Sequence, residues 1–112
     1  MRIPQADRAF IAIEKLTDYL LNVDHPDGGP KARVFAHAGF SGERPEEFEK
    51  ALREQHLTRD ARPGKHSLFG NKYEITAFLQ GPKGEVLVTS VWMTRHGETF
   101  PRLITVVPED EP

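Results

Sequence analysis

The residues best suited to chemistry in this sequence lie on either side of a glycine pair. His25 and Lys31 flank Gly28 and Gly29, and the segment leads into Pro30, a residue suited to the first turn of a helix. Histidine titrates near neutral pH, and free backbone N–H groups at a helix start can bind a phosphate. The segment predicts either phosphate binding and acid–base work, or a structural turn in which the histidine caps the first helix and the lysine is solvated.

A second set of candidates falls within an alternating pattern in the last third of the chain. Tyr73, Trp92 and Arg102 belong to three different expected strands. Trp92 could be an aromatic platform or a core side chain. Arg102 could face solvent or an anion, since an unpaired charge among apolar neighbours is costly. Thr89 and Thr105 are strand-forming residues whose hydroxyls could also bind a phosphate.

Together these side chains could cleave RNA without a metal. A base takes the 2′-hydroxyl proton, an acid protonates the leaving 5′-oxygen, and a cation stabilises the phosphorane. The predicted catalytic residues are His25, Lys31, Tyr73 and Arg102, and the predicted substrate-binding residues are Trp92, Thr89 and Thr105. No cofactor and no metal is expected, because the sequence has no cysteine, no His-Glu-x-x-His motif and no glycine-rich nucleotide loop.

The elements that position these residues follow from the spacing of apolar side chains. Helices are expected over about 13–23, 31–38 and 45–56, and alternation over 72–107 predicts an antiparallel sheet. The fold class is therefore α+β, with two to three N-terminal helices packed on a three- to four-stranded antiparallel β-meander. A fourth strand would form if residues 65–69 pair at an edge. The first helix should bury one stripe, consisting of Ile13, Leu16, Leu20 and Val23.

The length of 112 residues fits a single domain. The expected divisions are a lead-in at 1–12, a helical half at 13–56, a loop at 57–71, the sheet at 72–107 and an acidic tail at 108–112. A loop this long in a compact domain is typically functional or disordered. No segment resembles a signal peptide or a membrane span, so a cytoplasmic location without membrane contact is expected.

The charge distribution leaves two interpretations open. The formal net charge of −2 counts against a strong nucleic-acid binder. Residues 50–66 hold more basic than acidic side chains, which predicts either a local basic strip or a solvated loop.

Seven short segments, in this order, resemble an uncharacterised bacterial domain family found as stand-alone genes beside an antidote gene or as C-terminal domains of toxins. They cover about residues 4–107 and are Lys15-Leu16-x-x-Tyr19-Leu20-Leu21, His25-Pro26, Lys31-Ala32-Arg33-Val34-Phe35, Gly39-Phe40, Gly70-x-Lys72-Tyr73, Val91-Trp92 and Pro101-Arg102-Leu103-x-Thr105.

That family is in turn similar, at the level of fold, to the ribonuclease toxins grouped with barnase, EndoU, colicin nucleases and RelE. The resemblance implies N-terminal helices on an antiparallel meander and RNA cleavage on the sheet. Family members tend to end the last strand with an aromatic residue, where this chain has Val106 and Val107.

The sequence therefore predicts one of two functions. One is a toxin-like metal-independent endoribonuclease of a toxin–antitoxin pair, with RNA as substrate and an antitoxin or immunity-like protein as partner. The other is a non-catalytic protein-interaction module that binds a neighbouring gene product through an exposed strand edge.

Overall fold

The computed structural model describes residues 1–109, apart from the side chain of His66. The acidic tail expected over 108–112 thus lies mostly outside the described residues. In chain order the elements are η1 (Ala6–Arg8), α1 (Ile13–Lys15), η2 (Leu16–Leu20), α2 (Gly29–His37), α3 (Pro45–Ala51), η3 (Leu52–His56), β1 (Arg62–Ser67), β2 (Gly70–Gly81), β3 (Gly84–Arg95) and β4 (Arg102–Pro108). Within the described residues, no helix is long and apolar enough to cross a membrane.

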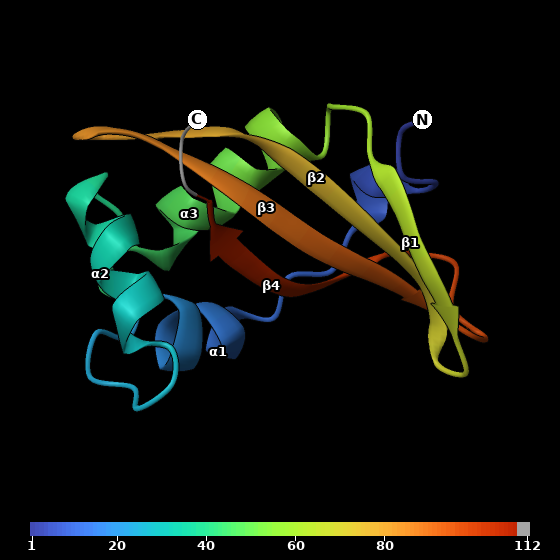
Figure 1. The fold of residues 1–112 in the computed structure, drawn as a ribbon, viewed down its shortest axis with the longest axis horizontal. Helices are drawn as coiled ribbons and strands as arrows, with labels where there is room; N and C mark the ends of the chain where they lie inside the picture. The colour runs from blue at the N-terminus through green and yellow to red at the C-terminus, as the bar shows by residue number, and fades with distance from the viewer. Residues whose placement is uncertain (110–112) are drawn as a thin grey trace.

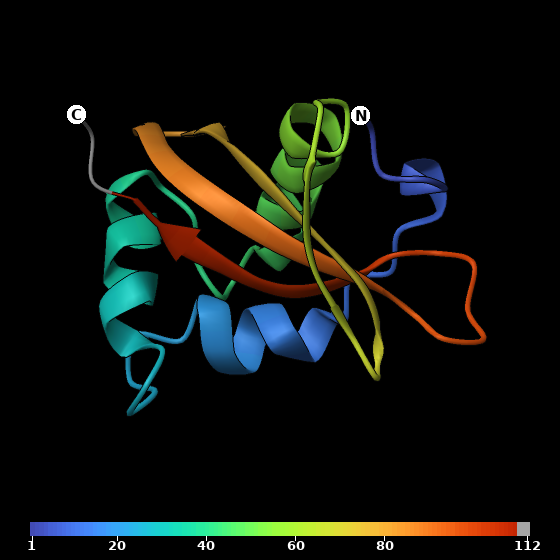
Figure 2. The same ribbon diagram turned by 45° about the vertical axis from the view of Figure 1, so that its right-hand side comes forward.

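The four strands form one antiparallel sheet in the order β1-β2-β3-β4. Figures 1 and 2 show α3 behind this sheet and α1 beneath β4, while α2 lies at the end nearest the β2–β3 turn. The α+β class, with N-terminal helices on an antiparallel meander, is therefore confirmed. The lead-in adds a short parallel bridge, in which the Phe10 amide and carbonyl bond to Pro101 and Leu103 at the β4 edge.

The expectation of a continuous loop over 57–71 is wrong. Residues Arg62–Ser67 form β1, which pairs with β2 and has an irregular register between Pro63 and His66. An edge strand leaves one row of backbone groups unpaired, so it tolerates a proline and a glycine that a central strand would not. The four-stranded alternative is the one that the chain adopts.

The first helix is shorter than predicted, and its buried residues differ from the predicted stripe. It changes at Leu16 into a π-helical turn, in which the Leu21 amide donates to the Leu16 carbonyl at 2.8 Å. An i→i+5 bond places more residues in each turn, which brings Leu21 onto the buried face. The helix ends at Leu20, so Val23 lies beyond it. Leu16, Leu20 and Leu21 are buried, whereas Ile13 and Val23 at the ends of the expected stripe are exposed.

A polar network lies in the core between the sheet and the helices. The Ser90 hydroxyl accepts a hydrogen bond from Trp92 Nε1 at 2.8 Å and lies 2.7 Å from His56 Nδ1. His56 Nε2 donates to the Ala77 carbonyl at 3.1 Å. Burial lowers the pKa of His56 to about 4, although the hydrogen bond to Ala77 opposes this shift and the charge of Arg59 adds to it. His56 is therefore a neutral, fully bonded core residue that links η3 to the sheet.

Candidate functional site

Four side chains from four different segments meet beside β4. Tyr19 comes from η2, His25 from the following loop, Lys31 from α2 and Thr105 from β4. Lys31 Nζ donates to Thr105 Oγ1 at 3.4 Å and lies 5.6 Å from the centre of the Tyr19 ring. The His25 ring packs edge-on against Tyr19 with 4.9 Å between ring centres. We call Tyr19, His25, Lys31 and Thr105 the Lys31 cluster; three of the four were predicted site residues.

The imidazole of His25 is fixed in one orientation. Its Nδ1 accepts hydrogen bonds from the backbone amides of Asp27 at 3.0 Å and Gly28 at 2.9 Å. An Nδ1 that accepts two bonds carries no proton, so the proton of the neutral ring resides on Nε2. The histidine thus holds the turn before α2, rather than capping the first helix, and keeps one N–H donor for a ligand.

A second lysine adds positive charge to the same part of β4. Lys15 Nζ donates to the carbonyl of Ile104, the residue before Thr105, at 2.9 Å. Within residues 1–109, neither Lys15 nor Lys31 forms an ion pair with an acid. Two ammonium groups without an acidic partner can attract and hold an anion such as a phosphate.

Arg102 lies apart from the Lys31 cluster and already has a partner. Its guanidinium donates to both carboxylate oxygens of Glu98, at 2.8 Å and 2.5 Å, and contacts the rings of Phe10 and Phe100 at 5.0 Å and 5.4 Å. The hydrogen bond lowers the pKa of Glu98 and raises the pKa of Arg102. A bidentate pair between two aromatic rings leaves the guanidinium little freedom to bind a substrate anion.

The remaining predicted residues belong to the interior of the fold. Trp92 is fully buried, which agrees with the core alternative and not with the aromatic platform. The reason is register, since position 92 shares the helix-covered face of β3 with Ser90. Tyr73 is its partner on β2 and packs partly buried against the core. Thr89, on the opposite face, is buried and pairs with the Thr76 hydroxyl at 2.7 Å.

Two residues of these arrangements were not predicted as site residues. Tyr19 stands in the first segment of the family-like pattern, and that was the available signal for it. Glu98 lies in the turn between β3 and β4. Its position four residues before Arg102, across that turn, was the available signal that a carboxylate could reach the arginine.

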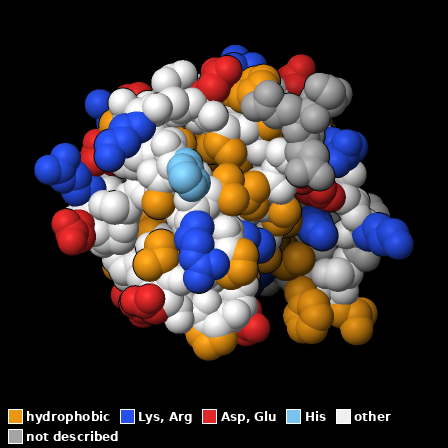
Figure 3. Space-filling view, turned by 60° about the vertical axis from the view of Figure 1, so that its left-hand side comes forward, with side chains coloured by type: hydrophobic (Ala, Val, Ile, Leu, Met, Phe, Trp, Pro, Cys, Tyr) orange, Lys and Arg blue, Asp and Glu red, His pale blue; other side chains and the backbone are white. Residues whose placement is uncertain are grey.

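The face that carries α2 has mixed charge. Figure 3, which brings this side forward, shows hydrophobic side chains near the centre around basic ones, with acidic side chains mostly toward the rim. The exposed residues of α2 include Arg33, Val34 and His37. The positive charge is therefore local, in keeping with the net charge of −2.

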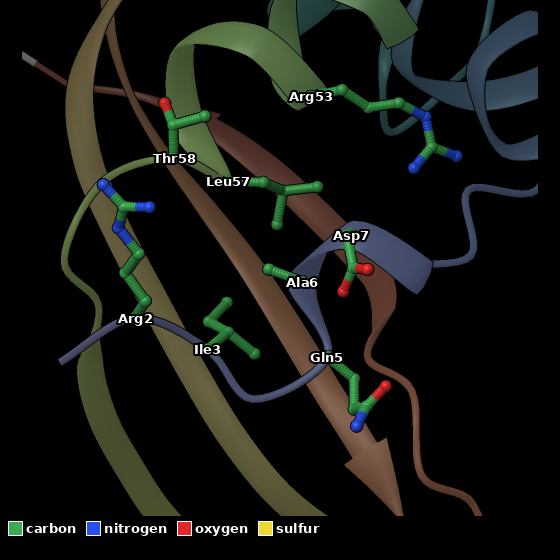
Figure 4. Close-up of a pocket in the computed structure, with 8 residues that line it drawn as sticks. All are labelled: Arg2, Ile3, Gln5, Ala6, Asp7, Arg53, Leu57 and Thr58. Atoms are coloured by element: carbon green, nitrogen blue, oxygen red, sulfur yellow. The ribbon is translucent and has the colours of Figure 1, made fainter.

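A pocket of about 460 Å³ lies elsewhere, between the N-terminal segment and the end of η3. Figure 4 shows Arg2 and Arg53 on opposite sides of Leu57, with Asp7 nearby. Arg53 is held by Glu49 and by the Ala9 carbonyl, both at 3.0 Å. The cavity contains none of the predicted site residues.

Comparison with known proteins gives a family and a fold. The family described as a domain of unknown function (DUF6883) matches residues 2–110, and the chain belongs to it. No curated protein matches the chain. Among solved structures, the chain is similar to one in a contact-dependent growth inhibition toxin–immunity protein complex from Klebsiella pneumoniae 342, with a TM-score of 0.60 and 15% identity. The match covers 88% of this chain and 98% of that one, and at this identity it establishes a common fold.

Proposed function

We propose that this DUF6883 member is a toxin-type domain that cleaves RNA at the Lys31 cluster and that a protein partner neutralises. The observation that carries the proposal is that His25 and Lys31, which both contact Tyr19, are brought beside Thr105 of β4, 74 positions beyond Lys31 in the chain. A fold in common with a chain of a toxin–immunity protein complex supports a place in such a pair.

The cluster offers groups suited to a phosphodiester. The Lys31 ammonium would neutralise the charge that develops on the phosphorane, and the His25 Nε2–H would donate to a phosphate oxygen. The hydroxyls of Tyr19 and Thr105 would orient the sugar–phosphate backbone. A buried or shielded cation beside hydrogen-bond donors is the arrangement that stabilises such a transition state most strongly.

The tautomer of His25 constrains the proton transfers. In the present conformation Nε2 carries the proton, so it can donate a hydrogen bond but cannot remove the 2′-hydroxyl proton. General-base action by Nε2 requires that the ring proton move to Nδ1 and that the amides of Asp27 and Gly28 lose their acceptor. Substrate binding would have to rearrange this turn if His25 is the base.

The proposal is tested by incubating the purified chain, free of partner, with total bacterial RNA in EDTA. Discrete fragments on a denaturing gel are the expected result, with cleavage increasing with enzyme concentration. RNA that stays intact over a wide range of a demonstrably folded protein would contradict the proposal.

A non-catalytic interaction module is the second candidate. The pairing of Arg102 with Glu98 and the burial of Trp92 favour it, because both remove groups expected to act on RNA. The two functions differ in what the isolated chain does to cells. Expression without a partner arrests growth if the chain cleaves RNA, and leaves growth unchanged if the chain only binds a protein.

A further inference from the structure

The tip of the β1–β2 hairpin exposes two adjacent large hydrophobic side chains. Leu68 is 92% exposed and Phe69 is 73% exposed, the highest values of any large hydrophobic residue among those described. A single exposed leucine is ordinary, whereas an adjacent pair at a projecting tip suggests a contact surface.

The backbone of this tip is held firmly although its side chains face solvent. The Phe69 amide donates to Ser67 Oγ at 3.0 Å, and the His96 amide donates to the Phe69 carbonyl at 3.0 Å. Gly70 packs so closely on β3 that a Cβ there would collide with the Thr94 carbonyl. The two side chains are thus presented by an ordered backbone, which lowers the entropy lost when a partner binds.

Positive charge surrounds the tip. Residues 61–73 contain no acid, and the exposed cations Lys65 and Arg95 form no ion pair within the described part of the chain. Glu74 of β2 and Glu98 of the β3–β4 turn are already paired with arginines. A chain of net charge −2 therefore has a basic, apolar end.

We propose that this tip, comprising Leu68, Phe69, Lys65 and Arg95, docks a protein partner whose surface is acidic around an apolar pocket. A leucine beside a phenylalanine fits such a pocket, and acidic groups around it complement the two cations. RNA offers bases that could stack on the phenylalanine but nothing that would bury the leucine. The proposal deepens the proposed function, because this partner is the neutralising protein.

The tip lies at the opposite end of the sheet from α2, which carries Lys31 (Figure 1). Partner binding and RNA cleavage can therefore be separated by mutation. A tip variant should cleave RNA at the wild-type rate, whereas Lys31→Ala should bind the partner with wild-type affinity.

The test uses the full chain and, as probes, the purified products of the two genes that flank its gene, with affinity measured by calorimetry. One product should bind wild-type protein. Leu68→Ser with Phe69→Ser should weaken that binding about 100-fold or more, the effect of losing interface anchors. The matched control, Ile13→Ser with Val23→Ser, also removes two exposed hydrophobic side chains and should leave affinity within about twofold. Lys65→Glu with Arg95→Glu should slow association and reduce its salt dependence.

Unchanged affinity of the tip variant, or no binding by either flanking product, would overturn the proposal. Transfer RNA and anionic phospholipid vesicles are parallel probes. Binding of either that is lost in the tip variant would instead assign the tip to that ligand. Wild-type dimers that become monomers in the tip variant would assign it to self-association.

Discussion

Lys31 and Thr105, 74 positions apart in the chain, meet with Nζ 3.4 Å from Oγ1. This contact ties the start of α2 to β4 and brings a cation to a hydroxyl beside Tyr19 and His25. Neither residue is an obvious partner of the other in the sequence. Their meeting is the main reason to locate the chemistry here rather than on the face that carries Trp92.

Two threonines of the sheet provide a matched pair of substitutions. Thr105→Val removes the hydroxyl that Lys31 contacts and should lower RNA cleavage about tenfold, with little change in stability. Thr89→Val removes a hydroxyl that bonds to Thr76 instead of Lys31 and should leave cleavage unchanged. Cleavage rates of both variants test this, and an equal loss in each would argue against a site at the Lys31 cluster.

Two substitutions separate the structural and chemical roles of His25. The oxygen of asparagine can take the place of Nδ1, so His25→Asn should preserve the turn before α2 but abolish cleavage. Glutamine cannot easily accept the same amides, so His25→Gln should cost about 1 kcal/mol of stability, as loss of a cap does. Chemical denaturation measures the stability. Full cleavage activity in His25→Asn would show that Nε2 plays no part.

Stability should depend on pH through His56. Its pKa is about 4 in the fold and near the ordinary 6.5 when unfolded, so the unfolded chain binds the extra proton first as pH falls. The contribution of His56 to the free energy of unfolding is fully present above about pH 6.5. It decreases as the pH falls to about 4, and the total loss is about 3 kcal/mol. Urea denaturation at several pH values measures it, with His56→Gln as the non-titrating reference. Equal pH profiles for the two proteins would rule out this source.

Arg102→Ala should lower thermal stability without lowering the rate of RNA cleavage. The guanidinium is bound to Glu98 and to two aromatic rings, so its loss leaves the carboxylate without its partner. Glu98→Gln, which keeps the shape of the pair, is the control and should have a smaller effect on melting temperature. If Arg102→Ala lost cleavage while keeping its stability, the prediction would be contradicted and Arg102 would belong to the catalytic site.

The class of fold could be predicted because helical and strand periods occupy separate parts of the chain. The helices expected over 31–38 and 45–56 correspond to α2 and to α3 with η3, and the alternation through Ile75 and Trp92 identified the central hairpin. These signals are local, and local backbone preferences agree with the final packing.

The features of the fold and of the site that the sequence did not predict correctly depend on tertiary contacts. The residue pattern does not predict the π-helical turn at Leu16, which brings Leu21 onto the buried face of the first helix. An edge position allows β1 despite Pro63, and register alone decides that Trp92 faces the core. The Lys31–Thr105 contact could not be predicted from the sequence either, because it depends on how α2 packs against β4.

Single-turnover RNA cleavage by Lys31→Ala, in EDTA and with folding verified, tests the central claim most directly. Lys50→Ala, which removes an exposed lysine of α3, is the matched control. The account predicts a rate at least about 100-fold below wild type for Lys31→Ala and an unchanged rate for Lys50→Ala. Equal cleavage by both variants and the wild type would contradict it.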